Sequence, residues 1–347
     1  MSKFPFRYWE FFWYLCVAII GGVGNFIVLF VIIKSKKLKS SSPFNILIFA
    51  LALTDLIASL IGLPNYILST DAFEHPTGAN GDLLCKLFTG YFWTFWFLEL
   101  SVILLVLVSL ERRAVVLNPF LTFYESSFKK TVALIIGSIF FTLLISTPNI
   151  VGVVYDKDNA RGGNFCRYKY TYYESLGIYG VIFLLDTIIP SGIILRCFYD
   201  IKNTLKKSND SITPKTISYE SLKASEKKNN PKIKTAETLQ LVVLAFFVCI
   251  IPNQILYVMS FAKVKGITWN SQIYQVAVLL RFSNSCINPI LYSFHSVNFR
   301  QNVRIVFNSW MQRNEQINFY SNESFITKHR SQSINSNVDS IESNPVI

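Results

Sequence analysis

Two asparagines, Asn284 and Asn288, and a proline, Pro289, lie inside a long apolar segment near the end of the chain. A proline within a helix removes one backbone hydrogen bond and clashes with the preceding turn. Amide side chains in hydrocarbon must find hydrogen-bond partners inside the protein, because lipid offers none. The segment therefore predicts a kinked, polar position inside a membrane helix, and other helices must supply its partners.

Polar side chains in three earlier apolar segments are the candidate partners. Asn25 follows the glycine-rich run 21–24, whose small residues let membrane helices approach closely. Asp55 and Ser101 lie in the middle of the next two segments. A carboxylate at midspan costs about 2.5–3.5 kcal/mol on insertion scales, so Asp55 is a candidate functional residue.

The distribution of apolar residues along the chain predicts the helices that hold these polar residues. The chain has 347 residues, of which 51% are hydrophobic and only 16% charged, and the apolar residues are gathered in blocks. Each block is long enough to span about 30 Å of hydrocarbon. We place seven spans near 10–33, 44–68, 86–112, 131–154, 174–200, 235–261 and 271–296. The sequence therefore predicts an all-α membrane protein, a bundle of seven transmembrane helices.

The net charge of +12 does not indicate nucleic acid, because the clusters of basic residues all flank one side of the spans. They gather at 34–39, 112–113, 129–130, 202–234 and 300–304. This is the positive-inside pattern, which puts the N-terminus outside and the C-terminus in the cytosol. We expect a multi-pass protein of the plasma membrane.

The remaining segments connect or follow the spans. We expect residues 1–9 to form a short extracellular N-terminus and 10–296 to form the transmembrane domain. The intracellular loop 201–234 and the cytoplasmic tail 311–347 are polar and expected to be disordered. Between them, 297–310 has apolar residues at helical spacing with arginines between, which predicts an amphipathic eighth helix on the inner leaflet.

Two of the six cysteines, Cys85 and Cys166, lie on predicted outer segments, where thiols are oxidised. We therefore predict a Cys85–Cys166 disulfide. Basic and aromatic residues alternate over 165–172, which suggests a strand or hairpin tethered over the mouth of the bundle.

Taken together, the motifs over about 10–310 resemble those of the rhodopsin-like G-protein-coupled receptors, and are closest to those of the peptide and neuropeptide receptors. Each short motif has a real false-positive rate, and the conjunction in this order carries the resemblance. It consists of Gly24-Asn25, Leu51-Ala52-x-x-Asp55, Cys85, Glu111-Arg112 with Pro119, Cys166, Pro190, Phe246-x-x-Cys249-x-x-Pro252, Asn288-Pro289-x-x-Tyr292 and Phe299.

The resemblance implies a ligand-activated switch and not an enzyme. It implies that a sodium ion, with Asp55 as its carboxylate ligand, is surrounded by Asn25, Asp55, Ser101, Asn284 and Asn288; no other cofactor is expected. Coupling to a heterotrimeric G-protein would come from outward movement of the sixth helix. The residues implied in activation are Glu111, Arg112, Pro190, Val102, Phe246, Pro252, Pro289 and Tyr292. Arrestin and membrane lipid are further expected partners.

Several positions depart from the family pattern. Ile250 stands where a tryptophan is usual, and Cys85 lies two residues further from Arg112 than is usual, which predicts an insertion. Lys232 or Lys234 stands where many members have an acid, so a lock with Arg112 is absent and raised basal activity is expected.

Three further charges, Glu99, Asp186 and Arg281, fall at membrane depth and should face the interior and pair. One interpretation is a structural Glu99–Arg281 salt bridge. The other is that Glu99 and Asp186, with Arg281, anchor a charged end of the ligand. Thr94 occupies the position of the amine receptors' aspartate, and it joins Asn253 among the ligand-pocket candidates.

We favour a short-peptide ligand. A biogenic amine or another small molecule is the alternative ligand, and a membrane transporter or channel is the alternative class of protein. Repeated halves, which would favour a transporter, are not evident in the sequence. A nucleophile–base pair, a metal cluster or a phosphate loop, which would favour an enzyme, is not evident either.

Overall fold

The computed structural model describes residues 6–35, 42–70, 72–118, 127–156, 166–211, 231–269, 271–295 and 299–312. Within these ranges the side chains of 207–211, 231–240, 242, 261 and 292–295 are not described. Residues up to Val297 form one compact unit, and the helix at 299–312 belongs to a second. The predicted eighth helix at 297–310 is thus helical over 299–312, whereas the tail from 313 lies outside the described residues.

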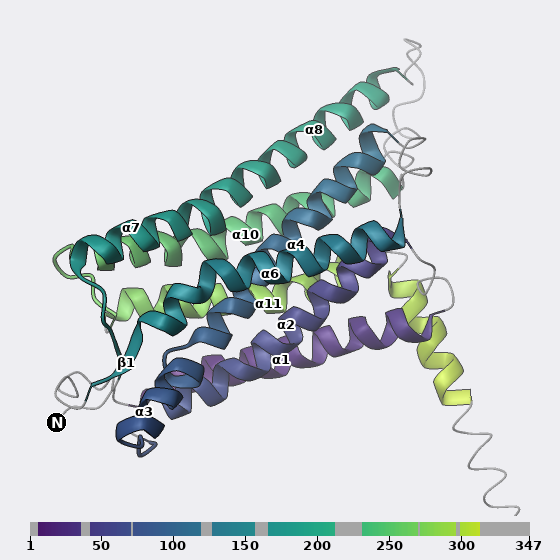
Figure 1. Cartoon of the computed structure of the whole chain (residues 1–347). Helices are drawn as coiled ribbons and strands as arrows, with labels where there is room; N and C mark the ends of the chain where they lie inside the picture. The colour runs from purple at the N-terminus through teal and green to yellow at the C-terminus, as the bar shows by residue number, and fades with distance from the viewer. Residues whose placement is uncertain are drawn as a thin grey trace, which may run out of the picture. The chain divides into compact units, whose positions relative to one another are not determined.

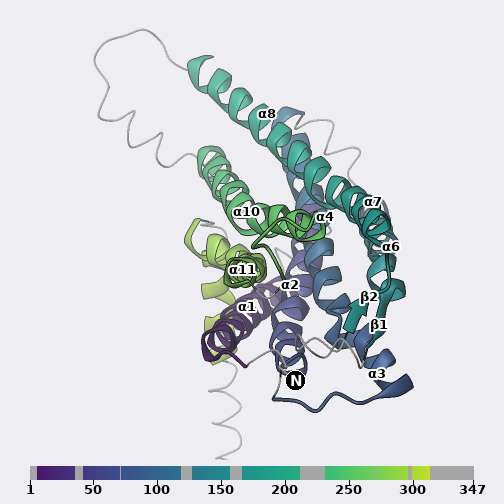
Figure 2. The same cartoon turned by 90° about the vertical axis from the view of Figure 1, so that its left-hand side faces the viewer.

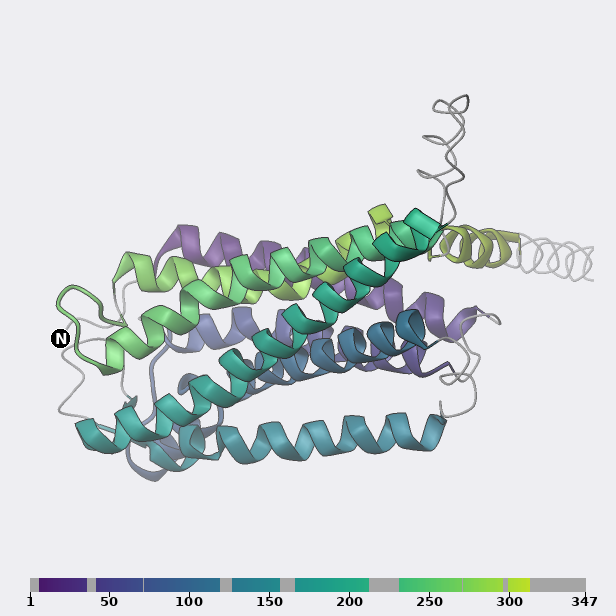
Figure 3. The same ribbon diagram turned by 90° about the horizontal axis from the view of Figure 1, so that it is seen from above.

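The helices of the first unit lie side by side along their length (Figures 1 and 3). The spans are formed by α1 (Tyr8–Lys34), α2 (Pro43–Leu68), α4 (Phe92–Leu117), α6 (Phe128–Gly152), α7 (Tyr172–Phe183) with α8 (Ile189–Ser211), α10 (Pro231–Phe261) and α11 (Gln272–His295). Among the described residues, six stretches are long and apolar enough to cross a membrane, and α11 is not one of them. The predicted seven-helix bundle is confirmed.

The helices of the fifth and sixth spans are longer than the sequence predicts. The predicted disordered loop 201–234 is wrong at both ends, because α8 continues to Ser211 and α10 already begins at Pro231. The polar, amphipathic end of α8 lacks the apolar signal by which a membrane span is recognised. Residues 212–230 lie outside the described part of the chain.

The third span is interrupted near its outer end. A short helix, α3 (Gly78–Leu84), leads into a π-helical turn (Cys85–Thr89), after which Gly90 and Tyr91 precede α4. Tyr91 has a φ of 61°, a left-handed conformation that is uncommon for a bulky residue. This irregular turn contains the extra residues that the Cys85-to-Arg112 spacing predicts.

Small residues on α1 let it pack closely against α2 and α11. A Cβ atom added to Gly21 would lie 2.3 Å from Ser59 Oγ, and one added to Gly24 would lie 2.9 Å from Pro289 Cβ. Such distances leave no room for a side chain. The predicted packing role of the run 21–24 is therefore confirmed at these two positions.

A two-stranded hairpin crosses the outer end of the bundle, near α3 (Figure 2). Strand β1 (Val153–Tyr155) pairs antiparallel with β2 (Cys166–Tyr168). Cys85 and Cys166 form a disulfide with an S–S distance of 2.06 Å, as predicted. Directly after the hairpin, Thr171 and Glu174 form a capping box that starts α7.

Candidate functional site

The buried carboxylate of Asp55 lies at the centre of the helix bundle. Ser101 Oγ donates to Asp55 Oδ1 at 2.7 Å, and Asn288 Nδ2 donates to Asp55 Oδ2 at 2.9 Å. These two bonds join α2 to α4 and α11, so Pro289 follows a residue that is held by Asp55. The polar side chains of the last span thus obtain partners from other helices, as hydrocarbon requires.

Asn25 joins this polar region by contacts with the backbone. Its Nδ2 donates to the carbonyl oxygens of Gly21 and Ser285, both at 2.9 Å. Asn25 therefore links α1 to α11 without a hydrogen bond to Asp55 among the described contacts. Asn284 is buried on α11 at the preceding turn from Asn288.

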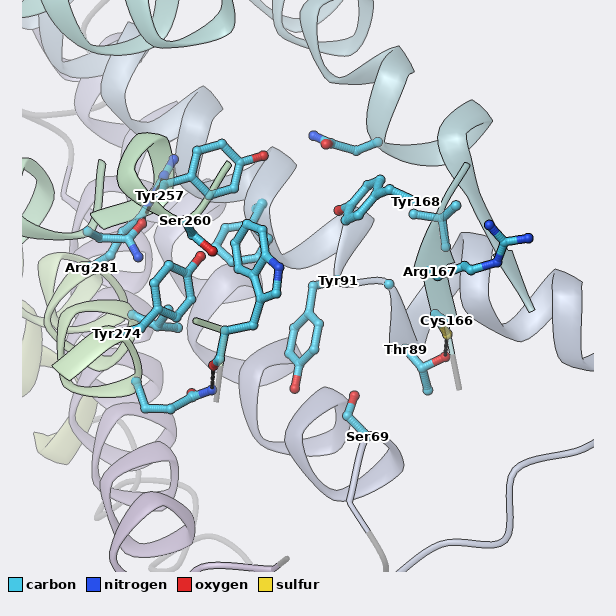
Figure 4. Close-up of a pocket in the computed structure, with 18 of the residues that line it drawn as sticks. Ser69, Thr89, Tyr91, Cys166, Arg167, Tyr168, Tyr257, Ser260, Tyr274 and Arg281 are labelled. Carbon is cyan, nitrogen blue, oxygen red and sulfur yellow. Dashed lines mark hydrogen bonds between the residues drawn. The ribbon is translucent and has the colours of Figure 1, made fainter. Parts of the chain in front are cut away.

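A cavity of about 570 Å³ opens under the hairpin at the outer end of the bundle. Its walls are aromatic, with contributions from the irregular turn of the third span, the hairpin and the outer ends of α10 and α11. Figure 4 shows two sides of the cavity, with Tyr257, Tyr274 and Arg281 on one and Cys166, Arg167 and Tyr168 on the other. Tyr91 lies between them, and its hydroxyl points toward Ser69 (Figure 4).

Arg281 pairs with Asp186 and not with Glu99. Its Nη2 lies 3.3 Å from Asp186 Oδ2, and its Nη1 donates to Asn253 Oδ1 at 3.3 Å. Gln254 Nε2 donates to the same Asp186 oxygen at 2.6 Å. The predicted Glu99–Arg281 salt bridge is therefore wrong. The rotation of the fifth helix brings Asp186 to the guanidinium, and helical rotation cannot be read from apolar blocks.

Glu99 lines the cavity and takes a different partner. Its Oε2 accepts a hydrogen bond from the hydroxyl of Ser146, on α6. Two of the ligand-pocket candidates, Thr94 and Asp186, are fully buried and do not line the cavity. Thr94 instead accepts a hydrogen bond from Asn65 on α2. Glu99, Asn253 and Arg281 do line the cavity.

The residues implied in activation occupy the middle and the inner end of the bundle. Val102, Pro190 and Phe246 are buried on α4, α8 and α10. Glu111 is half-buried near the inner end of α4, and Pro252 and Pro289 lie inside α10 and α11. Tyr292, Lys232 and Lys234 have side chains outside the described set, so their predicted roles stay predictions.

Two neighbouring arginines at the inner end of α4 make different contacts. The Arg112 guanidinium lies over the Phe44 ring of α2, 3.1 Å from its centroid. Arg113 Nε donates to Asp200 Oδ2 at 2.7 Å, and Asp200 also accepts from Arg196 at 3.2 Å. Arg113 therefore makes a polar link from α4 to α8, and it stands where the family usually has a tyrosine.

Several residues of the site were missed by sequence reasoning. Ser146, Asn149 and Gln254 are ordinary polar residues in apolar segments and become notable only through their neighbours. Tyr91 could have been found, because the insertion predicted between Cys85 and Arg112 places an irregular turn beside it.

A seven-helix membrane bundle with a buried polar core and an outer cavity under a disulfide-anchored hairpin is the architecture of a membrane receptor. Residues 24–292 match the family described as 7 transmembrane receptor (rhodopsin family), and the chain belongs to that family. It is a G-protein-coupled receptor of the plasma membrane that crosses it several times, and it is not an enzyme.

Curated relatives are similar over most of their length. The somatostatin receptor type 1 of Rattus norvegicus is 27% identical over 317 residues, which are 89% of this chain and 75% of the relative. The galanin receptor type 1 of Homo sapiens is 26% identical over 309 residues, 86% of this chain and 81% of the relative. The allatostatin-A receptor of Bombyx mori is 29% identical over 290 residues, 82% of this chain and 75% of the relative.

Proposed function

We propose that the chain binds a short extracellular peptide in the outer cavity and transmits the signal to a heterotrimeric G-protein. The observation that carries this proposal is the cavity itself. Its volume of about 570 Å³ lies within the range of about 300–1,000 Å³ that is usual for ligand sites. Its mixture of aromatic walls with a few charged groups suits a peptide, whose side chains and backbone need both.

Relatives support the same class of ligand. The names of three of them refer to somatostatin, galanin and allatostatin-A. Identities of 26–29% over most of the chain do not transfer a particular peptide. The names of these relatives favour a peptide over a biogenic amine.

Activation is proposed to move the inner end of α10 outward, with Pro252, a proline inside the helix, as the pivot. A peptide can favour this state only if it binds the open conformation more tightly than the closed one. Asn253 and Gln254 directly follow the pivot and line the cavity, so they can pass a change in contacts there to the helix.

A reporter assay tests this function. Cells expressing the wild type, Arg112→Ala or Arg196→Ala would carry a promiscuous G-protein, and both basal output and the response to short peptides and amines would be recorded. Arg196 is the matched control because it is an exposed arginine on the neighbouring α8. We expect peptide responses that Arg112→Ala loses and Arg196→Ala keeps. Ion or substrate flux without G-protein signalling would favour the transporter or channel instead.

The same assay measures basal activity. The sequence predicts a raised basal output, because a lysine stands where many family members place an acid. Output from unstimulated wild type no higher than that from empty cells would contradict this expectation. Recruitment of labelled arrestin after stimulation would test the expected arrestin partner.

We further propose that a sodium ion binds beside Asp55. Two buried oxygens of this region, Asn25 Oδ1 and Ser285 Oγ, have no hydrogen-bond partner among the described residues. Together with the carboxylate of Asp55 and the hydroxyl of Ser101 they form a set of hard oxygen donors, which suits such a cation. Sodium chloride should raise the thermal stability of the wild type more than choline chloride does. Asp55→Asn should abolish the difference; an equal response of both proteins would contradict the site.

A further inference from the structure

The acid in the floor of the cavity has no counter-charge within ion-pair distance. Glu99 is 4% exposed and accepts a hydrogen bond from Ser146. It forms no ion pair with any side chain that the structure describes. The nearby cation, Arg281, is engaged by Asp186. A buried carboxylate that faces a cavity in this way is stabilised when a cation enters.

A second acceptor lies on the same wall. Asn149 follows Ser146 by three residues on α6, so the two side chains are neighbours on one helical face. Asn149 lines the cavity, and its buried Oδ1 has no hydrogen-bond partner among the described residues. Glu99 and Asn149 thus present a carboxyl group and an amide oxygen to whatever occupies the cavity.

The lining residue Asn253, on α10, presents a donor. Asn253 Oδ1 accepts from Arg281 Nη1, and this contact fixes the orientation of the amide. Its Nδ2 therefore faces away from the guanidinium, and it is buried without a partner among the described residues. Because the charge of Arg281 is balanced by Asp186, this part of the lining offers a neutral donor and not a free positive charge.

We propose that Glu99 and Asn149 bind a positively charged group of the ligand, either an ammonium or a guanidinium. Asn253 donates to a neighbouring carbonyl of the same ligand. The ligand is then a peptide with a basic side chain or a free N-terminus, beside an aromatic or apolar group that packs on Phe95. Phe95 precedes Glu99 by one turn of α4 and lines the same cavity. This assignment rests on the proposed peptide function and names the chemistry of its site.

A binding test that needs no knowledge of the peptide uses the purified full chain. Thermal unfolding would be followed with increasing phenethylammonium, which is charged at neutral pH because alkylamines have pKa values near 10. The comparison compounds are 3-phenylpropanol and 3-phenylpropionate, which keep the ring and remove or reverse the charge. We expect a saturable rise in unfolding temperature with the cation alone. Equal shifts with all three compounds, or no shift with the cation, would overturn the proposal.

Two variants assign the effect to Glu99. Glu99→Gln keeps an acceptor for Ser146 and should weaken phenethylammonium binding on the order of 10- to 100-fold, the usual loss for a charge-assisted hydrogen bond. Glu10→Gln is the matched control, because Glu10 lines the same cavity but is paired with Arg7 at 3.0 Å. An unchanged affinity in Glu99→Gln would overturn the assignment.

A test with peptides distinguishes failure of the proposed cation site from failure of the proposed peptide function. A panel of short aromatic peptides would carry lysine, norleucine or glutamate at one position and be tested in the reporter assay. Wild type should prefer lysine, and Glu99→Lys should prefer glutamate. If the ammonium compound binds through Glu99 while no peptide signals, the peptide function fails and the cation site stands. Peptides that signal without regard to charge would overturn the cation site and leave the function intact.

Discussion

At the scale of single residues, Asp186 and Arg281 pair, so that each buried charge in the outer half of the bundle is balanced by the other. Both side chains are buried, and the guanidinium lies between an acid on the fifth span and an amide on α10. A buried pair of this kind contributes little beyond its desolvation cost, but the loss of one partner leaves an unpaired charge.

Arg281→Met should therefore be strongly destabilising, by about 3–5 kcal/mol. Asp186→Asn in the same chain removes the stranded charge and still offers an oxygen to Gln254. The double variant should be more stable than Arg281→Met alone, with a coupling of about 0.5–3 kcal/mol. Thermal unfolding in detergent and surface expression measure this. Strictly additive losses would show that the two residues act independently.

His75, between α2 and α3, gives the outer surface a dependence on pH. Its Nδ1 contacts the Pro76 carbonyl at 2.9 Å and its Nε2 contacts Thr89 Oγ1 at 3.0 Å, while its ring stacks on Tyr155. Burial lowers the pKa of His75 from 6.5. The folded chain therefore favours the neutral ring. Its contribution to stability is fully present above the ordinary pKa of 6.5 and is lost as pH falls through the lowered pKa of the folded chain.

Lowering the pH from about 7.5 to about 5.5 should consequently reduce the stability of the wild type more than that of His75→Asn, which cannot titrate in this range. Thermal unfolding over a pH series would measure the difference between the two proteins. Parallel pH profiles would show that the imidazole has no part in the loss.

The contacts of single residues were the hardest part of the site to predict. From the sequence, Glu99, Asp186 and Arg281 are expected to pair, because an unpaired charge at membrane depth is unfavourable. Which acid meets Arg281 depends on how the fifth span and α11 are rotated about their axes, and an apolar block leaves that rotation open. Asp55 was easier, because its donors Ser101 and Asn288 lie at similar depth on neighbouring spans.

At the scale of elements, the contact of α1 with α11 depends on the absence of a side chain at Gly24. Gly24→Ala should destabilise the bundle, because the added Cβ would lie 2.9 Å from Pro289. Gly137→Ala is the control, since a Cβ added there meets nothing within 4 Å. That variant should be neutral or up to about 1 kcal/mol more stable, because alanine is the better helix former. Thermal unfolding of the two variants measures the difference. Equal changes in the unfolding temperature of Gly24→Ala and Gly137→Ala would contradict the packing argument.

Elements were predictable to the extent that hydropathy signals them. The spans are found because they are long and apolar, and the hairpin because basic and aromatic residues alternate before Thr171. The inner end of α8 was missed because its residues are polar, although they are helical to Ser211. The outer part of the third span was anticipated only from spacing, and no local sequence signal gives the left-handed Tyr91.

At the scale of the whole molecule, the Cys85–Cys166 disulfide joins segments separated by 81 residues. Because it restricts the unfolded chain, its loss should cost about 2–4 kcal/mol. It also fixes β2 to the third span, so reduction should weaken peptide responses in the reporter assay. Dithiothreitol should lower the unfolding temperature of the wild type and leave Cys85→Ala/Cys166→Ala unchanged. Equal effects of the reductant on both proteins would contradict this role.

The polar character of α11 has a consequence for the insertion of the protein into the membrane during synthesis. Six stretches of the described chain are long and apolar enough to cross a membrane, but α11, with Arg281, Asn284 and Asn288, is not among them. It is also the last helix of the bundle to leave the ribosome. Its partners Asp55 and Asp186 are made earlier and lie in spans already inserted. Until α11 is inserted, Asp55 therefore lacks the hydrogen bond from Asn288 and Asp186 lacks the ion pair with Arg281, so the earlier spans hold two incompletely paired acids in the membrane.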